Sequence, residues 1–239
     1  MKKIIIIGAT SGIGYEIAMR YAAQGNQVGI TGRRTDFLEE IQQKYPSNIH
    51  IKTMDVCKDT ATEELQALIT EMGGVDTIFI NSGYGKECKE LDADTEMQAV
   101  ATNAMGFTNL IIFSYNYFKT QPKGHIVVTS SVASVRALRQ SPAYSATKRY
   151  MRHYVDCLAQ RARHEKLNIR FTTLIPGFIA TDFLEARQNY PLLISLDKAC
   201  NIIYKAIEKK KRDVYLPFRW NFVVLLWKLI PKWFWERCW

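Results

Sequence analysis

Residues 4–14 read Ile-Ile-Ile-Ile-Gly-Ala-Thr-Ser-Gly-Ile-Gly, and this stretch decides the fold. Four consecutive isoleucines predict a strand buried on both faces, which is typical of a parallel sheet covered by helices on each side. The glycines at positions 8, 12 and 14 predict a tight turn into a helix. Such a turn lets backbone N–H groups and the helix N-terminus approach a pyrophosphate. A turn that binds nothing is the alternative, but three glycines so close together favour binding.

Apolar, β-branched runs alternate along the chain with segments of helical spacing. The runs expected to form strands are 4–7, 28–31, 49–53, 77–80, 125–129 and 169–175. The segments expected to form helices are 13–23, 37–44, 63–72, 97–118 and 144–164. This alternation predicts an α/β fold, a doubly wound parallel sheet with helices on both faces.

Length and composition predict one domain with a C-terminal appendage. At 239 residues and 47% hydrophobic content, the chain can bury one large core. Composition changes after about Val214, so we expect the domain to span residues 1–217 and the appendage 218–239. Five scattered cysteines without a C-x-x-C pair predict neither disulfides nor a metal site, and they indicate a reducing, cytoplasmic compartment. The first apolar run is too short for a signal-peptide core.

The appendage is rich in cations and tryptophan. The net charge of +9 is concentrated after residue 204, and all five tryptophans lie within 218–239. The uncharged run 220–227 has eight residues, far below the roughly 20 needed to span a bilayer. Tryptophan favours the headgroup region, where cations of 218–239 and of the upstream run 209–212 could engage anionic lipid. The cations of the appendage are Arg219, Lys228, Lys232 and Arg237.

These features predict peripheral contact with the inner face of an anionic membrane. Nucleic acid would also suit the charge, but the chain has no recognisable nucleic-acid-binding module, so we expect no nucleic-acid partner. Packing at a dimer interface or over the substrate cleft is the alternative role for 218–239.

The expected end of the second strand indicates which dinucleotide binds. A carboxylate there commonly binds the ribose hydroxyls of NAD, whereas this chain has Gly32-Arg33-Arg34. A guanidinium can hold a ribose 2′-phosphate bidentately, so NADP(H) is preferred over NAD(H). One arginine could simply be a solvated surface residue, and Arg34 suits that alternative better than Arg33. Asp55 and Val56, just after the third strand, are placed to meet the adenine.

Tyr144 and Lys148 lie four residues apart on an expected helix, so they share one face. A neighbouring cation favours the phenolate of a tyrosine, whose unperturbed pKa is about 10. Such a tyrosine could act as a general acid or base near neutral pH. Ser131, near the end of the fifth strand, could hold a substrate oxygen. A surface Tyr and Lys on an amphipathic helix is the alternative for that pair alone.

These residues belong to a series of landmarks that resembles the short-chain dehydrogenase/reductase family, in its compact single-domain branch. In chain order the landmarks are the glycine-rich turn, Asn81-Ser82-Gly83, Asn103, Ser131, Tyr144-x-x-x-Lys148 and Pro176-Gly177-Phe178-Ile179-Ala180-Thr181. They cover nearly the whole chain at family-like spacing, and the resemblance implies a Rossmann-type fold. One departure is Ile80, where the family usually has an asparagine of mainly structural role.

The resemblance implies a catalytic tetrad of Asn103, Ser131, Tyr144 and Lys148. Ser131 is preferred to Ser130, which would be a packing residue, because the family's serine lies thirteen positions before its tyrosine. Ser131 would orient the carbonyl and Tyr144 would transfer the proton. Lys148 would bind the nicotinamide ribose, and Asn103 would hold a water in a proton relay from Lys148.

The glycine turn, the two arginines and the resemblance together define the expected cofactor residues. They are Gly8, Ser11, Gly12, Ile13, Gly14, Arg33, Arg34, Asp55, Val56, Asn81, Ser82, Gly83, Tyr144, Lys148, Pro176, Gly177, Ile179 and Thr181. Within this set, 176–181 would cradle the carboxamide end of the nicotinamide.

We therefore predict an NADPH-dependent oxidoreductase that interconverts a carbonyl compound and a secondary alcohol, working as a homodimer or homotetramer. The expected substrate-facing segments are 84–88, 131–141 and 182–193, and the last is apolar enough to indicate a lipophilic ketone and a flexible lid. Arg136 and Arg139 could meet an anionic substrate group or be solvated loop cations. The alternative function is a cofactor-binding regulatory or interaction protein on the same fold, but an intact tetrad argues against it.

Overall fold

The computed structural model describes residues 1–87, 90–181 and 190–238. Its centre is a seven-stranded, wholly parallel sheet of order β3-β2-β1-β4-β5-β6-β9. The strands are β1 (Lys3–Ile7), β2 (Gln27–Gly32), β3 (Ile49–Thr53), β4 (Thr77–Ile80), β5 (Gly124–Thr129), β6 (Ile169–Pro176) and β9 (Asp213–Leu216). Two short strands, β7 (Ile179–Ala180) and β8 (Ile194–Ser195), pair beside the sheet.

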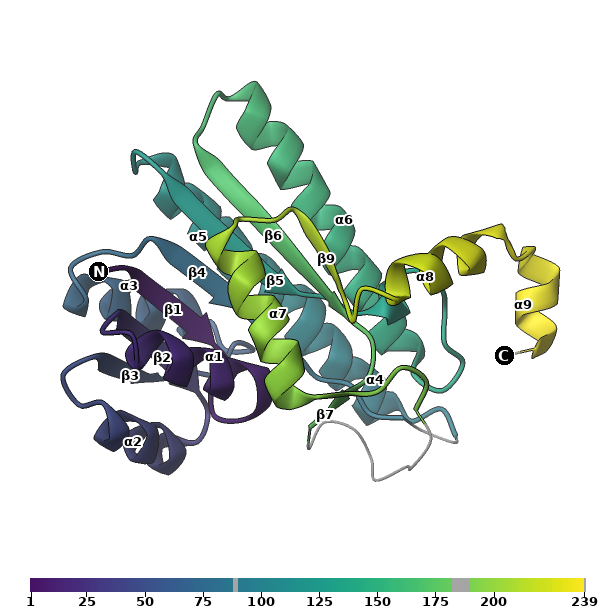
Figure 1. Ribbon diagram of the computed structural model, residues 1–239, viewed down its shortest axis with the longest axis horizontal. Coiled ribbons are helices and arrows are strands. Elements are labelled where there is room, and N and C mark those ends of the chain that lie inside the picture. Colours follow the sequence, from purple (N-terminus) through teal and green to yellow (C-terminus); the bar gives the residue numbers. More distant parts are fainter. Residues whose placement is uncertain (88–89, 182–189, 239) are drawn as a thin grey trace.

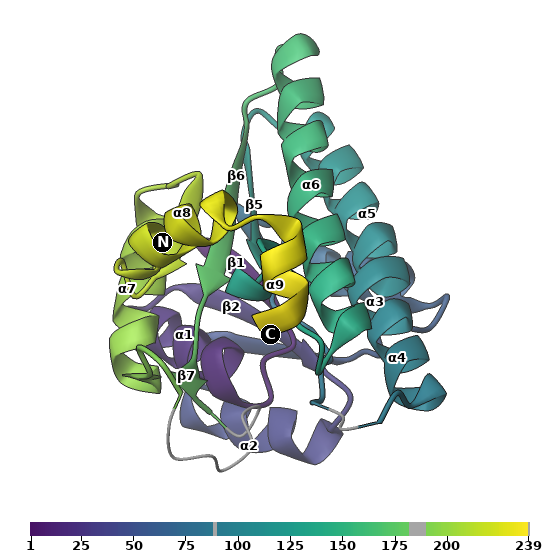
Figure 2. The same ribbon diagram turned by 90° about the vertical axis from the view of Figure 1, so that its right-hand side faces the viewer.

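Helices cover both faces of the sheet, as Figures 1 and 2 show, and the predicted doubly wound fold is confirmed. The helices are α1 (Gly12–Ala22), α2 (Thr35–Lys44), α3 (Ala61–Glu71), α4 (Ala93–Val100), α5 (Phe107–Lys119), α6 (Pro142–His164), α7 (Leu196–Glu208), α8 (Trp220–Leu229) and α9 (Lys232–Cys238). The short helical segments η1 (Ala101–Gly106) and η2 (Val132–Ser134) precede α5 and α6.

The isoleucine run of β1 is continuous because each face of the sheet has its own core. Ile4 and Ile6 pack with residues of α1, α2 and α7 in one cluster. Ile5 and Ile7 pack with residues of α3, α5 and α6 in the other. All four are at most 1% exposed, as expected for a strand covered on both sides.

Most predicted elements agree with the structure to within about two residues, and the largest difference concerns the helix predicted over 97–118. The helix expected at 97–118 begins at Ala93, where the Asp92 side chain accepts a hydrogen bond from the Thr95 amide at 2.9 Å. It then passes through the π-helical η1 before α5. The helix α7 and the strand β9 were not predicted, and β9 has only four residues and follows a run of cations. The helices α8 and α9 form in the segment 218–239, which was expected as an amphipathic, interfacial appendage.

The segment 218–238 packs against the domain through its inner face. Trp220 and Val224 of α8 are buried in a cluster with Val132, Val135 and Ile175. Figure 1 shows α8 and α9 projecting beyond the end of β9. Among the described residues, no helix has the length and apolar character required to cross a bilayer.

Candidate active site

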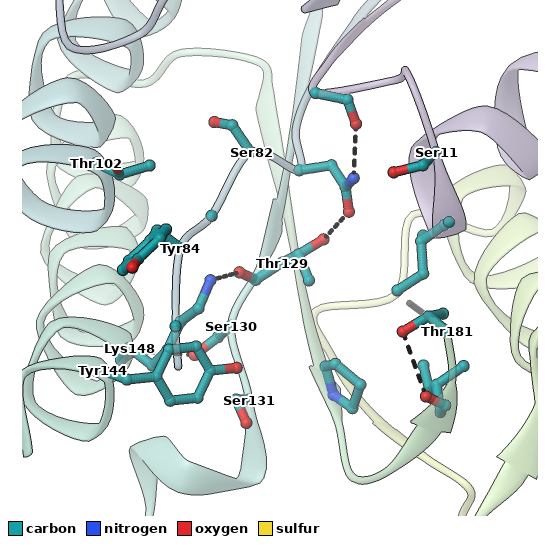
Figure 3. Close-up of a pocket in the computed structure, with 18 of the residues that line it drawn as sticks. Ser11, Ser82, Tyr84, Thr102, Thr129, Ser130, Ser131, Tyr144, Lys148 and Thr181 are labelled. Atoms are coloured by element: carbon teal, nitrogen blue, oxygen red, sulfur yellow. Dashed lines mark hydrogen bonds between the residues drawn. The ribbon is translucent and has the colours of Figure 1, made fainter. Parts of the chain in front are cut away.

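A cavity of about 690 Å³ lies at the carboxyl ends of the strands, where the chain order reverses between β1 and β4. This topological switch point is where open α/β sheets bind ligands. Figure 3 shows its two walls, with Tyr84, Tyr144 and Lys148 on one and Ser11 and Thr181 on the other. Of the predicted cofactor residues, all but Gly14 line the cavity.

The glycines allow the turn to pack closely against neighbouring backbone, since a Cβ at Gly8 or Gly14 would clash with it. Gly8 and Gly12 also line the cavity. Gly8 has φ +84°, and a Cβ there would lie 2.8 Å from the Ser82 Cα. Gly12 has φ +57°, a conformation that favours glycine. A Cβ on Gly14 would overlap the Gly8 carbonyl oxygen, so Gly14 serves the close packing of α1 against the turn. The N-terminus of α1 therefore faces the cavity directly.

Asn81 joins three strands at the base of this turn. Its Nδ2 donates to the Gly8 carbonyl at 3.0 Å, and its Oδ1 accepts from the Thr129 hydroxyl at 2.9 Å. Both bonds are drawn in Figure 3. Ile80, the departure from the family pattern, is fully buried in the core. The local geometry of the loop is held by Asn81.

The two arginines after β2 differ in their surroundings. Arg34 donates to the Thr10 hydroxyl at 2.8 Å and lies over the Phe37 ring at 4.2 Å. Arg33 is exposed and makes no hydrogen bond or ion pair within the described part of the chain. A guanidinium without a protein partner at this end of the cavity suits a phosphate ligand. Asp55 and Val56 line the same end.

Tyr144 and Ser131 face each other across the other end of the cavity. Tyr144 is positioned by the first turn of α6, which begins at Pro142, and its ring packs where a Cβ on Gly85 would lie. Burial raises the pKa of Tyr144, and a hydrogen bond with Ser131 opposes that rise. The pKa of Tyr144 was predicted to fall beside Lys148, whereas burial is the largest influence on this pKa and raises it. Tyr144 is a protonated donor at neutral pH.

Lys148 is 3% exposed, and burial lowers its pKa to about 8. Its Nζ donates to the Thr129 carbonyl at 2.9 Å and lies 5.7 Å from the centre of the Tyr144 ring. Ser130 donates to the Lys148 carbonyl at 2.9 Å, so it holds α6 against β5. Ser130 thus has the packing position expected of it. The ammonium of Lys148 stands beside Tyr144 at the cavity wall.

Asn103 is fully buried in η1 and does not line the cavity. Its Oδ1 accepts from the Tyr84 amide at 2.9 Å, and its Nδ2 donates to the Tyr84 carbonyl at 2.6 Å and to Thr147 at 3.2 Å. These bonds fix the 83–85 backbone beside Lys148 and Tyr144. The Asn103 side chain therefore positions that loop, and its part in a proton relay through a water stays a prediction.

The segment 176–181 forms the wall opposite Tyr144. Thr181 donates to the Ile179 carbonyl at 3.4 Å, as drawn in Figure 3. A Cβ on Gly177 would overlap the indole nitrogen of Trp220, which packs behind it. Helix α8 therefore supports this wall directly.

The expected substrate-facing segments are only partly described. Residues of 84–87 and 132–141 line the cavity, as do Phe178 and Tyr190. Cys88 and residues 182–189 of the expected lid at 182–193 lie outside the described residues. Arg136 is neither a cavity residue nor a solvated cation: it donates to the carbonyls of Trp227 and Ile230.

Thr129 and Trp220 are among the site residues that were missed from the sequence. The Thr129 carbonyl accepts a hydrogen bond from the Lys148 ammonium, and the Thr129 hydroxyl donates to Asn81. Thr129 is the last residue of β5, and that position could have indicated a role in the site. Trp220 supports Gly177 from 43 positions away, and no local pattern indicates that contact.

Comparison with known proteins identifies the family. The family model for short chain dehydrogenase matches residues 2–190. An uncharacterized oxidoreductase of Listeria monocytogenes is 37% identical over 191 residues, which cover 77% of each chain. An uncharacterized oxidoreductase of Mycobacterium tuberculosis is 30% identical over 243 residues, covering 97% of this chain and 95% of that one. The chain belongs to the short-chain dehydrogenase/reductase family and is an oxidoreductase of that family.

Solved structures share the fold. An alcohol dehydrogenase from Thermococcus sibiricus, complexed with 5-hydroxy-NADP, has a TM-score of 0.77 at 24% identity and covers 90% of this chain and 96% of its own. A short chain dehydrogenase/reductase from Burkholderia phymatum, in complex with NAD, has a TM-score of 0.82 at 17% identity, covering 94% and 92%. At these identities the likeness concerns the fold.

Proposed function

We propose that this protein reduces a lipophilic carbonyl compound to a secondary alcohol with NADPH, or catalyses the reverse reaction. The observation that carries the proposal is the pair Ser131 and Tyr144, hydrogen-bonded at one end of a cavity whose other end reaches Arg33. A dinucleotide bound along that cavity supplies the hydride. An interaction protein on this fold would not need a partly buried tyrosine beside a buried serine and a buried lysine.

The residues divide the chemistry between them. Ser131 orients the carbonyl oxygen by donating a hydrogen bond, and Tyr144 transfers its proton to that oxygen. Burial keeps Tyr144 protonated at neutral pH, which suits reduction. Lys148, whose pKa is about 8, carries a positive charge at pH 7 and helps to hold the ribose. Asn103 positions the loop that packs against Tyr144.

The proposed cofactor preference depends on Arg33. A ribose 2′-phosphate at the β2 end of the cavity would meet the Arg33 guanidinium, which pairs with none of the described residues. Arg34 would approach from Thr10. Gly8, Gly12 and the N-terminus of α1 would hold the pyrophosphate. The segment 176–181 would hold the carboxamide, with the Ile179 backbone and the Thr181 hydroxyl as contacts.

A screen of carbonyl compounds tests the proposal. Purified protein is mixed with NADPH and either 2-decanone or the polar control dihydroxyacetone, and the loss of NADPH absorbance is followed. We expect turnover of 2-decanone at a higher kcat/KM than dihydroxyacetone, and faster turnover with NADPH than with NADH. Equal rates for the two ketones would contradict a lipophilic substrate, and an absence of NADPH oxidation across a broad panel of ketones would contradict reductase activity.

The proposed site of peripheral membrane contact is the outer face of α8 and α9. Its exposed apolar residues are Phe218, Phe222, Leu225, Leu226, Leu229, Trp233 and Phe234. Its exposed cations are Arg219, Lys228, Lys232 and Arg237, against the single carboxylate of Glu236. Aromatic and basic residues on one face suit an anionic bilayer at the cytoplasmic side.

The cation run 209–212 is not part of this surface. It precedes β9, whereas α8 follows the other end of that strand. Arg212 donates to Asp156 at 2.5 Å and to Thr173 at 3.1 Å. We therefore confine the proposed lipid contact to 218–239, as α8 and α9 present it.

A second apolar face supports the proposed homo-oligomer. Met97 of α4, Met105 of η1, Ile112 of α5 and Tyr150 of α6 are each at least 40% exposed on helices that pack together. Figure 2 shows these helices on one side of the molecule. Packing against a second copy would bury this face. The Met105→Glu variant should shift a dimer or tetramer towards monomer in sedimentation velocity, and an unchanged distribution would remove this face as the interface.

A further inference from the structure

Arg136 binds the C-terminal end of α8. Its Nε donates to the Trp227 carbonyl at 2.8 Å, and its Nη2 donates to the Ile230 carbonyl. The last carbonyls of a helix lack partners within the helix, and a cation there complements the helix dipole. Arg136 therefore provides a cap for α8 from a distant part of the chain.

Helix α9 is attached to the same loop. Trp235 is 6% exposed, and its Nε1 donates to the Ala137 carbonyl at 2.9 Å. The Arg136 guanidinium also lies over the Trp235 ring, 5.4 Å from its centre. Two adjacent residues of one loop thus hold both C-terminal helices.

That loop, residues 132–141, is also a wall of the cavity. Val132, Ala133 and Leu138 line it, and the Leu138 amide donates to the Ser145 hydroxyl on α6 at 3.2 Å. The loop is therefore fixed by α6 on one side and by the C-terminal helices on the other. Arg136 and Ala137 therefore connect the C-terminal helices to a wall of the cavity.

A series of neighbouring aromatic rings also connects α8 and α9 to the cavity wall. Trp235, Trp227, Trp220 and Phe178 follow one another with ring centres 5.3, 5.4 and 6.0 Å apart. Phe178 stacks on Tyr190 at 4.6 Å, and both line the cavity. The inner face of the helix pair thus reaches the cavity wall.

The two helices depend on their surroundings for stability. Helix α8 has ten residues and α9 has seven, and isolated helices shorter than about 12–15 residues are marginal in water. Their inner face packs on the 132–141 loop, and their outer face is the proposed lipid surface. Lipid bound to the outer face would stabilise α8, and with it the C-terminal carbonyls of α8 that Arg136 binds.

We infer that membrane binding by α8 and α9 orders the 132–141 loop, so that the substrate end of the active site is completed at the membrane. This regulation rests on the membrane contact proposed above. Arg136 is a positioning residue, since it touches the helix and not the cavity. Because coupling between two sites is reciprocal, ligands that order the loop also raise membrane affinity.

Hydrogen exchange of the loop amides tests the coupling without relying on activity. The full-length protein is compared in buffer, with phosphatidylglycerol vesicles and with phosphatidylcholine vesicles at low salt. We expect phosphatidylglycerol vesicles to slow exchange in 132–141 by about tenfold, within the usual range of coupling between sites. Phosphatidylcholine vesicles should leave it unchanged.

Variants separate the coupling from the binding. Arg136→Ala should still sediment with phosphatidylglycerol vesicles but lose the protection of the loop. Arg139→Ala is the matched control, because Arg139 lies in the same loop, is exposed and has no hydrogen bond or ion pair with the described residues. It should behave like the unaltered protein. If Arg136→Ala fails to bind vesicles, Arg136→Lys, which keeps the charge at the end of α8, should bind and show reduced protection.

The outcomes distinguish this inference from the proposed function. Vesicle binding without slower exchange in the loop would overturn the coupling and leave the membrane contact intact. Equal protection of the loop in Arg136→Ala would overturn the role of Arg136. If the unaltered protein did not sediment with phosphatidylglycerol vesicles, the membrane contact itself would be wrong and the coupling would fall with it.

Discussion

The indole of Trp220 fills the space beside Gly177 that a β-carbon would occupy. Gly177 lies in the segment proposed to hold the nicotinamide, and Trp220 lies in the first turn of α8, where it is 1% exposed. Its Nε1 is buried without a hydrogen-bond partner among the described residues. The 176–181 wall of the cavity and helix α8 are therefore in direct contact.

Gly177→Ala should push Trp220 out of place, and overpacking of this kind costs about 1–3 kcal/mol. We expect a weaker NADPH affinity and a red-shifted tryptophan emission, since all five tryptophans lie in 218–239. Gly25→Ala is the control, because Gly25 has φ +74° but no atom near its Cβ position. It should lower stability through backbone strain and leave the emission unchanged. An unchanged emission in Gly177→Ala would show that the wall yields without moving Trp220.

Arg33→Ala should remove most of the preference for NADPH over NADH. A hydrogen bond to a charged group contributes about 1.5–3 kcal/mol, or roughly ten- to a hundredfold in affinity. NADH affinity should barely move, because NADH has no 2′-phosphate. Arg34→Ala is the comparison and should keep most of the preference, since Arg34 is already bound to Thr10. Equal weakening of both cofactors by Arg33→Ala would mean that Arg33 supports the fold instead.

His125 should make the protein sensitive to acid. It is 2% exposed and bonded to Thr172 at 2.8 Å, and burial lowers its pKa to about 3. The unfolded state, with a pKa of about 6.5, binds this proton first, so stability falls as pH drops from 6.5 towards 3. Between pH 7.5 and 5 the protonation of His125 in the unfolded state should lower the free energy of unfolding by about 2 kcal/mol. Urea unfolding of His125→Gln should show a smaller loss over that interval, and an equal loss would exclude His125 as the cause.

The sequence predicted the sheet and most of the site because both depend on local patterns. The buried run 4–7 and the glycine turn after it place a strand and a helix in a fixed relation. Tyr144 and Lys148 share a face of one helix whether or not that face is buried. The sequence pattern does not show how deeply these two side chains are buried. The pKa of Tyr144 was expected to fall because the neighbouring lysine is visible in the sequence, whereas the burial that raises it is not.

Contacts between distant segments account for the other misses. Arg136 meets α8 across more than 90 positions, and Trp220 meets Gly177 only because β9 brings α8 to that wall. Cutting the chain before residue 218 would also expose the cluster around Trp220 and Val224. Point substitutions on the outer face are therefore the better test of lipid binding.

Leu226→Glu together with Leu229→Glu should abolish sedimentation with phosphatidylglycerol vesicles, because both residues are more than 60% exposed on the outer face of α8. The fold should survive, since neither residue is in the buried cluster. Ala67→Glu, an exposed position on α3, adds a negative charge elsewhere and should leave sedimentation unchanged. Retained binding in the double variant would refute this surface as the lipid contact.

Ser131→Ala should lower kcat/KM for the carbonyl substrate severely, though less than loss of the tyrosine hydroxyl. The serine orients the oxygen, and its hydroxyl also accepts from the Ala133 amide at 3.1 Å. Ser131→Thr keeps a hydroxyl and should recover part of the activity. If alanine and threonine variants were equally impaired, the loss would come from packing at the start of η2 and not from the hydroxyl.

The central claim is that Tyr144 transfers the proton, and the most direct test is the turnover of Tyr144→Phe with a confirmed carbonyl substrate and NADPH. The change removes one hydroxyl and little volume, so NADPH affinity should stay within about twofold while kcat falls at least about a hundredfold, the lower end for a general acid. Tyr84→Phe is the matched control at the same cavity, because Tyr84 is held through its backbone. It should keep most of its activity. Turnover by Tyr144→Phe near that of the unaltered protein would contradict the mechanism.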